Sequence, residues 1–334
     1  MRHRFAAALD RLVPAAEAIG LAVSGGPDSL GLLKLALDDG RRPLRVATVD
    51  HGLRAGSADE AVGVAALCRS LGVAHDTLTP AHPIGERNVQ ARARVARYAA
   101  LRVWAGRHDL GAVATGHQMD DQAETLAMRF VRGSGLHGLA GVRARLVLAD
   151  RPGPPFAIVR PCLGLRRAEL AAVVAAAGWC AVDDPANIDS RFDRARMRAH
   201  LPATAVPGLM RSAEALGEAS DALRWAEGQA AALAWREADG AVTIAPAGLP
   251  AALLRALLTR AVHRLAPDAS PPSGPEGDRL LARLHAGGTA TLRGLSFAGD
   301  TPWRIAPAPA PSHDCKTRSA PYLETMPFSP DARE

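Results

Sequence analysis

An apolar segment that ends in a glycine turn and resumes as an apolar helix constrains the fold of this chain more than any other feature. Ile19 to Val23 predict a buried strand, which ends at Ser24-Gly25-Gly26. Pro27 follows, and its fixed φ and missing N–H suit the first turn of a helix. Glycines let the backbone approach an anion closely, and a helix N-terminus offers that anion free N–H groups. The segment therefore predicts a phosphate cradle, with the hydroxyls of Ser24 and Ser29 as added donors.

Apolar runs and helical stretches alternate along the first half of the chain. We expect strands at 19–23, 44–49, 73–79, 111–115 and 156–159, and helices at 57–71, 88–107 and 120–132. This alternation predicts an α/β fold, a Rossmann-like parallel sheet with helices on both faces. Such sheets bind ligands at the carboxyl ends of their strands, so the segments beginning at Ser24, Asp50 and His117 are expected to meet in one pocket.

The character of the sequence changes near residue 203. Residues 207–240 predict one or two alanine-rich helices and 249–266 predict another, whereas the Pro- and Gly-rich stretch 267–277 predicts a linker or long loop. The proline-rich segment after residue 305 predicts a poorly ordered tail. We therefore expect a domain over 1–203, a mainly helical C-terminal module over 204–305 and a tail over 306–334.

The formal net charge is +6, and the positive charge is almost entirely arginine. This balance favours a polyanionic partner, although biased codon usage also produces such a ratio of arginine to lysine. The four cysteines form no C-x-x-C pair, which argues against a disulfide framework or a cysteine metal site. No signal-peptide core and no apolar run of membrane-spanning length occurs, so we expect a cytoplasmic protein with no membrane partner.

Three groups of residues carry candidate chemistry. His117, Asp120, Asp121 and Glu124 share one face of a helix that begins just after a strand. Carboxylates beside phosphate oxygens are good Mg²⁺ ligands, but the same pattern suits a solvated acidic helix start.

The other two groups are basic. Arg94, Arg97 and Tyr98 share a helical face that could hold a phosphate and stack a base, or belong to a surface helix whose tyrosine packs on the core. A second basic segment suits a nucleic-acid backbone, a loop that folds over a triphosphate, or a solvated helix; it contains Arg191, Arg194, Arg196 and Arg198.

The motifs together resemble one family. Residues 24–29 resemble the PP-loop S-G-G-x-D-S of the ATP pyrophosphatases, and they lack the spacing and the Gly-Lys-Ser/Thr of a Walker A loop. The segments at 49–54 (V-D-H-G-L-R), 88–101, 114–125, 132–139, 160–163 and 184–198 are similar, in order, to those of tRNA(Ile)-lysidine synthetases. The resemblance covers residues 17–203. Gln118 and Ala195 depart from the family pattern, which puts these two positions in doubt as chemical participants.

The resemblance implies a C–N ligase that uses ATP and Mg²⁺ to attach L-lysine to the wobble cytidine of the isoleucine tRNA with anticodon CAU. The reaction would pass through an adenylated cytidine and release pyrophosphate and AMP. Residues 1–203 would form the PP-loop ATP-binding catalytic domain, and 204–305 would recognise the tRNA. Which residues read the anticodon or hold the lysine, and the oligomeric state, stay open.

The resemblance to this family also implies roles for individual residues of the site. The expected nucleotide-binding residues are Ser24, Gly25, Gly26, Pro27, Asp28, Ser29, Asp50 and His51. The expected catalytic residues are Asp28, His117, Asp120 and Asp121, with His117 and Asp120 as candidates for the base and Asp28 and Asp121 as candidate Mg²⁺ ligands. The expected tRNA or substrate contacts are Arg94, Arg97, Tyr98, Glu124, Arg191, Arg194, Arg196 and Arg198.

Three alternative functions fit the residues less well. A PP-loop tRNA cytidine thiolase typically needs paired cysteines to carry sulfur, and the cysteines here are isolated. An amidotransferase-type ligase for a small molecule needs a glutaminase domain or another source of ammonia, for which the chain offers no spare segment. A nucleotide-binding regulator without catalysis would lose the carboxylates, yet Asp28, Asp120 and Asp121 are all present.

Overall fold

The computed structural model describes residues 1–15, 17–52, 56–81, 89–148, 156–182 and 193–309. The chain divides into two units, Met1–Ala222 and Leu223–Glu334. The division falls inside the long helix α9 (Val206–Ala234), whereas the composition of the sequence changes near residue 203. Each unit is described by itself.

The first unit is built on a six-stranded sheet in the order β3-β2-β1-β4-β6-β5. Its parallel strands are β1 (Ile19–Ala22), β2 (Leu44–Val49), β3 (Ala74–Leu78), β4 (Ala112–Thr115) and β6 (Phe156–Val159). All five were predicted from the sequence. The sixth strand, β5 (Arg145–Leu148), was not predicted, and it runs antiparallel to β6 at the edge. The direction of strand addition reverses between β1 and β4, which is where ligands bind in sheets of this kind.

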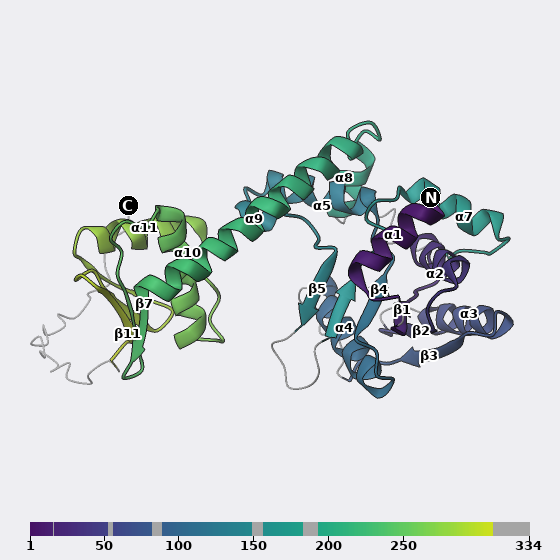
Figure 1. Cartoon of the computed structure of the whole chain (residues 1–334), viewed down its shortest axis with the longest axis horizontal. Coiled ribbons are helices and arrows are strands. Elements are labelled where there is room, and N and C mark those ends of the chain that lie inside the picture. The colour runs from purple at the N-terminus through teal and green to yellow at the C-terminus, as the bar shows by residue number, and fades with distance from the viewer. Residues whose placement is uncertain (16, 53–55, 82–88, 149–155, 183–192, 310–334) are drawn as a thin grey trace, which may run out of the picture. The chain divides into compact units, whose positions relative to one another are not determined.

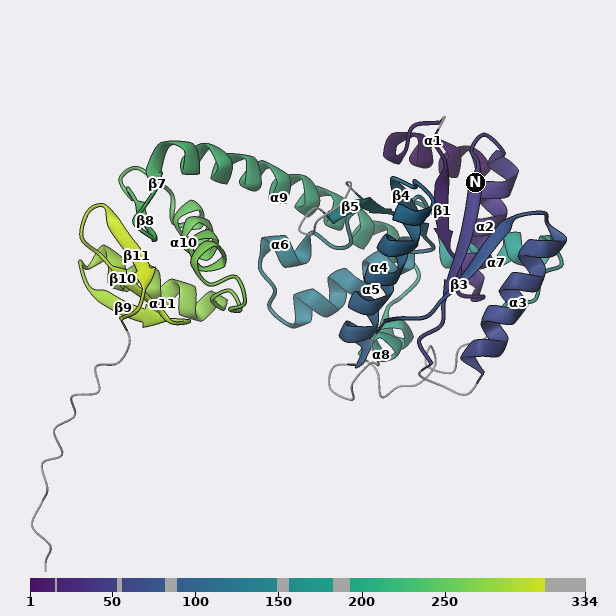
Figure 2. The same cartoon turned by 90° about the horizontal axis from the view of Figure 1, so that it is seen from below.

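Helices cover both faces of this sheet (Figures 1 and 2), as expected. One face packs against α1 (Arg2–Leu12), α2 (Pro27–Asp39), α3 (Ser57–Ser70) and α7 (Arg167–Ala176), whose apolar residues form one core with the strands. The other face packs against α4 (Val89–Arg107), where Leu101 and Trp104 join a second core. Three further helices are α5 (Met119–Val131), α6 (Leu136–Leu139) and α8 (Asp193–His200). Beta strands buried on both faces explain the near-continuous apolar runs in the sequence.

The second unit contains the expected helices and a sheet that was not predicted. Part of α9 and α10 (Ala251–Leu265) match the expected helices, and α11 (Gly274–His285) begins within the segment expected to be a loop. Ser273 and Glu276 form a capping box at the start of α11. The antiparallel sheet has the order β7-β8-β11-β10-β9, with strands Trp235–Ala238, Ala241–Ile244, Thr289–Leu292, Leu295–Ala298 and Trp303–Pro307 for β7 to β11. Residues 310–334, most of the expected tail, lie outside the described residues.

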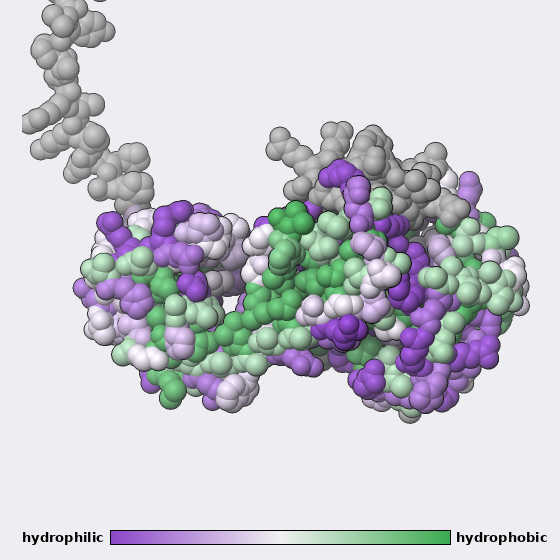
Figure 3. Space-filling view, turned by 90° about the horizontal axis from the view of Figure 1, so that it is seen from above, coloured by the Kyte–Doolittle hydropathy of each residue, from purple (hydrophilic) through white to green (hydrophobic). Residues whose placement is uncertain are grey.

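Two further features concern α9 and the helices in general. Figure 3 shows hydrophobic residues gathered along α9, where Trp225 and Leu233 are exposed. Some apolar side chains of α9 are therefore exposed.

Among the described helices, none has the length and apolar character needed to cross a membrane.

Candidate active site

The predicted phosphate cradle lies between β1 and α2. Gly25 has a φ of +87°, a conformation that favours glycine, and its carbonyl accepts a hydrogen bond from the N–H of Val182 at 3.0 Å. Gly26 caps α2 with extended backbone, Pro27 occupies the first turn, and no side chain of this described loop caps the helix. The first N–H groups of α2 are therefore available to an anion.

The two serines of the cradle have different surroundings. The buried hydroxyl of Ser29 donates to the carbonyl of Gly26 at 2.9 Å and accepts from the N–H of Ser24 at 3.1 Å. Ser29 thus holds the loop in shape. The hydroxyl of Ser24 belongs to an exposed residue and lies 3.3 Å from that of Ser29, so Ser24 is the serine better placed to meet a ligand.

Gly116 brings the end of β4 against the start of α2. A Cβ atom at Gly116 would lie 2.8 Å from the carbonyl oxygen of Asp28, closer than real contacts allow. Only glycine therefore permits this approach, which places the segment from His117 to Asp121 beside the cradle.

Asp28 carries an unsatisfied carboxylate oxygen in this cradle. Its Oδ2 lies 3.5 Å from Nε2 of Gln118 and 3.8 Å from Nε of Arg167, whereas its Oδ1 is buried without a hydrogen-bond partner. Burial, and next the charge of Asp121, raise the pKa of Asp28 to about 6, against the opposing effect of Arg167. A buried oxygen without a donor, next to a second carboxylate, suits a cation.

Gln118 organises the start of α5, although sequence reasoning left its role in doubt. Its Oε1 accepts hydrogen bonds from the N–H groups of Asp120 and Asp121, and its own N–H donates to Oδ2 of Asp121 at 3.1 Å. This capping box fixes Asp121 in the first turn of the helix. The side chain of Gln118 is fully buried and also reaches Asp28, so it connects α5 to the cradle.

Asp121 and Glu124 bind arginines from two other helices. Oδ1 of Asp121 lies 2.9 Å from Nη2 of Arg194 and 3.3 Å from Nη2 of Arg167. The buried Glu124 accepts from Arg167, Arg194 and Arg198 at distances of 3.0, 2.9 and 2.9 Å. Burial alone would raise the pKa of Glu124, but hydrogen bonds and charge from these arginines hold it below its usual value.

Two arginines of the basic segment that was predicted to contact tRNA or substrate contact carboxylates of the protein itself in this structure. Arg194 and Arg198 contact the carboxylates of α5, Arg196 is exposed on α8, and Arg191 lies outside the described residues. Arg167, which no motif indicated, joins the two carboxylates to Asp28.

Asp120 has a different set of partners. Its carboxylate lies 2.9 Å from Nη2 of Arg166 and accepts from the backbone N–H of Arg167 at 2.9 Å. Burial opposes ionisation, but these donors hold the pKa of Asp120 below its usual value. Asp120 therefore fastens the start of α7 to α5, and a carboxylate with so many donors is a weak proton acceptor.

His117 and Tyr98 lie among arginines. Nδ1 of His117 is 2.8 Å from Oγ1 of Thr115. Burial, followed by the charges of Arg160, Arg97, Arg94 and Arg194, lowers the pKa of His117 well below its usual value, so the imidazole is neutral near pH 7. The guanidinium carbons of Arg94 and Arg97 lie 5.0 and 5.6 Å from the centre of the Tyr98 ring.

Asp50 and His51 follow the carboxyl end of β2, as predicted. Asp50 accepts from the N–H of Gly52 at 2.9 Å, and hydrogen bonds from Ser57 and Gly52 lower its pKa. Burial, and then the charge of Arg97, lower the pKa of His51, whose Nδ1 is buried without a hydrogen-bond partner. Asp50 thus shapes the turn before α3, and His51 offers an unsatisfied ring nitrogen.

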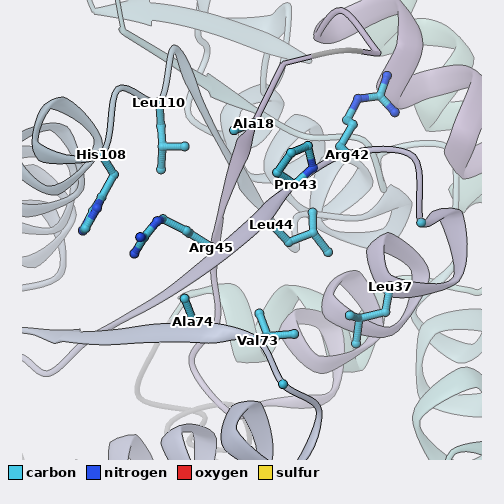
Figure 4. A pocket seen from close by; sticks show the side chains of 12 residues that line it. Ala18, Leu37, Arg42, Pro43, Leu44, Arg45, Val73, Ala74, His108 and Leu110 are labelled. Atoms are coloured by element: carbon cyan, nitrogen blue, oxygen red, sulfur yellow. The ribbon is translucent and has the colours of Figure 1, made fainter.

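A cavity of about 490 Å³ lies at the opposite edge of the sheet (Figure 4). It is lined by residues at the amino ends of β1, β2 and β3, among them Ala18, Leu44 and Ala74. None of the predicted site residues lines it. The cradle and the carboxylates gather instead at the carboxyl ends of the strands.

Metal binding by the protein alone is not supported within the described residues, where no group of three or more His, Cys, Asp or Glu side chains could hold an ion. Mg²⁺ commonly binds through one or two carboxylates completed by phosphates and water. Asp28, with its unsatisfied oxygen, and Asp121 match that smaller requirement.

Comparisons with known proteins identify the family of the chain. A family model described as a PP-loop domain matches residues 1–204. A tRNA(Ile)-lysidine synthase of Novosphingobium aromaticivorans is 46% identical over 311 residues, which cover 92% of this chain and 93% of that protein. The protein of the same name from Zymomonas mobilis is 37% identical over 300 residues, covering 89% of this chain and 90% of that one.

Among solved structures, the U34-tRNA thiolase NcsA of Methanococcus maripaludis has a similar fold. The TM-score is 0.53 at 16% sequence identity, over 65% of this chain and 77% of that one. This likeness concerns the fold alone. The family match and the relatives along most of the sequence confirm the resemblance carried by the motifs: the chain belongs to the tRNA(Ile)-lysidine synthase family of PP-loop proteins.

Proposed function

We propose that this protein ligates L-lysine to the wobble cytidine of the isoleucine tRNA with anticodon CAU, at the expense of ATP. The name carried by its relatives supports the reaction class. The observation that carries the proposal is the uncapped N-terminus of α2, whose first turn carries Asp28 close enough to Asp121 for the charge of Asp121 to raise its pKa. That arrangement suits cleavage of a nucleotide between its α and β phosphates. The protein would act in the cytoplasm, together with its tRNA.

The cradle would hold the triphosphate of ATP. The N–H groups at the start of α2 and the hydroxyl of Ser24 are the donors best placed for it, while Gly25, Gly26, Pro27 and Ser29 set the path of the loop. In the first step the cytosine O2 attacks the α-phosphorus, the bond to the pyrophosphate oxygen breaks, and pyrophosphate leaves. Donors fixed in place before the reaction stabilise the charge that develops on the departing group.

Asp28 and Asp121 would hold Mg²⁺ with the phosphates. When bound, Mg²⁺ would neutralise charge on the phosphate oxygens and the leaving pyrophosphate. The pKa of Asp28, about 6, requires this carboxyl group to lose its proton before it can bind a cation. Asp50 and His51 stay proposed nucleotide contacts at the neighbouring strand end.

The tRNA would be held by basic residues on α4 and α8. Arg94, Arg97 and Tyr98 present guanidinium groups beside an aromatic ring, a combination suited to a phosphate and a base. Arg194 and Arg198, with Arg196 and Arg191, remain proposed contacts as well. Glu124 would hold both Arg194 and Arg198 in position. Asp121 would add a second contact to Arg194.

In the second step the ε-amine of lysine attacks C2 of the adenylated base, the C2–O bond breaks, and AMP leaves. The amine must first lose a proton. His117 and Asp120 stay the two proposed candidates for this proton: the lowered pKa leaves the His117 ring uncharged but makes it a weak base, and Asp120 is fastened to Arg166. The arginines around His117 would also favour the uncharged form of an amine placed beside them.

The test is incubation of the full chain with ATP, each labelled amino acid and purified tRNAs. The expected result is labelling by lysine alone, only on the CAU isoleucine tRNA, with one AMP formed for each lysine attached. Labelling with a different amino acid, or incorporation of sulfur from a sulfur donor, would overturn the proposal. The sulfur result is not expected, because the exposed Cys180 has no second cysteine in a C-x-x-C pair, and Cys68 and Cys162 are buried, which raises the pKa of Cys68 to about 11.

A further inference from the structure

Arg160 is a buried cation just after β6, in the segment 160–163 that resembles the family, and the sequence assigned it no role in the site. Only 2% of the residue is exposed. Its described hydrogen-bond acceptors are the carbonyl of Arg143 and the phenol oxygen of Tyr98, the latter 3.1 Å from Nη2. Buried arginines are normally paired with carboxylates, because an unpaired charge in the interior is costly.

Arg42 shows the ordinary arrangement in the same unit. It is also buried, but its guanidinium lies close to the carboxylates of Asp10 and Asp39 and donates to the carbonyl of Val13. It sits at the opposite edge of the sheet, among the residues that line the cavity in Figure 4. Arg42 is thus paired with carboxylates, whereas Arg160 has no carboxylate partner among the described residues.

Three guanidinium groups contact Tyr98. Arg160 donates to its phenol oxygen, while Arg94 and Arg97 lie against its ring. Nε of Arg97 and Nε of Arg160 are buried without hydrogen-bond partners. None of the ion pairs described for this unit joins these three arginines to a carboxylate. Three like charges around one ring are stabilised when an anion binds among them.

We propose that Arg160 is a positioning residue, which fixes the Tyr98 phenol from the sheet side so that the ring holds Arg94 and Arg97 facing a phosphodiester group of the tRNA. The inference rests on the proposed function, since tRNA supplies the phosphodiester. The triphosphate of ATP has its own cradle at α2, which leaves these arginines for the second substrate.

The geometry explains why this position holds arginine. One nitrogen of the planar guanidinium donates to the carbonyl of Arg143 and another donates to Tyr98, so the fork ties the phenol to the segment before β5. A lysine keeps the charge but has a single nitrogen on a flexible stem. Substitution by lysine should therefore loosen Tyr98 while keeping the site basic.

The test compares Arg160→Lys, Tyr98→Phe and the double variant with Arg42→Lys as the matched control, all in the full chain. The dependence of tRNA binding on salt is measured together with Tm and with KM for tRNA and for ATP. Arg160→Lys and Tyr98→Phe are each expected to raise KM for tRNA about tenfold, the scale of a hydrogen bond to a charged group, and to leave KM for ATP unchanged. The slope of log K against log salt should become shallower by about 0.7–0.9 for each phosphate that the variant no longer neutralises.

The double variant should be little worse than either single one, because both substitutions break the same hydrogen bond. Arg42→Lys should lower Tm and leave KM and the salt slope unchanged. The inference fails if Arg160→Lys lowers Tm only, as the control does, if the two substitutions are additive, or if KM for ATP rises instead. Failure of the proposed function is a separate result, seen as absence of lysine attachment by the unsubstituted protein.

Discussion

The side-chain amide of Gln118 lies 3.5 Å from Oδ2 of Asp28 and connects the N-cap of α5 to the first turn of α2. Gly116 permits this contact by bringing β4 close to the carbonyl of Asp28. The second oxygen of Asp28 stays buried without a partner. The cradle and the carboxylate helix are therefore linked through Gln118, and one buried acceptor of Asp28 stays unsatisfied beside that link.

The first prediction concerns activity. Asp28→Ala and Asp121→Ala should each reduce the rate of lysine attachment at least about 10²-fold, the scale of one electrostatic contribution to the transition state. Asp38→Asn is the control, because Asp38 lies in the last turn of the same helix and pairs with Lys34 and Arg2. Single-turnover rates with saturating ATP and tRNA measure the effect. Near-normal turnover by folded Asp28→Ala would remove Asp28 from the site.

The second prediction concerns stability and pH. The pKa of Asp28 is raised from 3.8 to about 6 in the folded protein, so the folded state binds more protons than the unfolded state between these values. The contribution of Asp28 to stability therefore declines as the pH rises from about 4 to about 6. Asp28→Asn, which avoids the buried charge, should raise Tm by about 2 °C or more at pH 7.5 and by nothing at pH 4.

Thermal melts of both proteins in EDTA, over a series of pH values, measure this difference. A Tm difference that is the same at every pH would contradict the raised pKa. Added Mg²⁺ and ATP should stabilise the unsubstituted protein more than the Asn variant, since only the carboxylate can bind the cation.

The third prediction concerns α8. Glu124 receives hydrogen bonds from Arg194 and Arg198 on that helix, so Glu124→Gln should release it. Amide hydrogen exchange over residues 193–200 should accelerate about tenfold or more, since hydrogen bonds between charged groups are among the stronger ones. Asp278→Asn is the control, because Asp278 pairs with Arg255 at an exposed site where ion pairs contribute little. Unchanged exchange in α8 would show that Glu124 does not hold it.

The fourth prediction concerns the net charge of +6. Binding of tRNA should weaken with salt, and log K should fall linearly with log salt by about 0.7–0.9 for each phosphate contact, because each contact releases counterions. Fluorescence anisotropy with labelled tRNA over a range of KCl concentrations provides the measurement. A flat response would leave the arginine content without this explanation.

Local patterns predicted the first sheet and the ends of its strands. Strands β1, β4 and β6 are buried apolar runs, whereas the edge strand β3 contains His75, Asp76 and Thr77. The segments after β1, β2 and β4 follow the carboxyl ends of neighbouring parallel strands. The antiparallel strand β5 alternates exposed and half-buried residues over only four positions, and most strands of the second sheet are as short. Such short alternations carry too little signal to separate a strand from a loop.

The sequence could not predict which side chains of the site form hydrogen bonds with one another. Arg166 and Asp120 are 46 residues apart, and Arg160 and Tyr98 are 62 apart, so their contacts depend on how α7 and β6 pack. The motif at α8 predicted a substrate role for its arginines but not that two of them bind Glu124. Spacing places groups on a helix face, whereas only the packed structure decides which partner each face meets.

The last prediction concerns the C-terminal part of the chain. The first half of α9 is fastened to the first unit, since Nδ1 of His137 lies 2.7 Å from Oγ of Ser220 and Arg143 donates to the carbonyl of Gly217 and to Asp221. A chain ending at Ala222 keeps these hydrogen bonds, whereas a chain ending at Ala203 cannot form them.

The Ala222 chain should therefore have the higher Tm, by about 2 °C or more for the hydrogen bonds retained. Both shortened chains should bind ATP, because the cradle is intact, and both should discriminate poorly between the CAU isoleucine tRNA and other tRNAs if the later residues select the tRNA. Thermal melts, ATP binding and competition between tRNAs measure the three properties. Full selectivity in the Ala222 chain would show that residues from 223 onward complete the protein without choosing its tRNA.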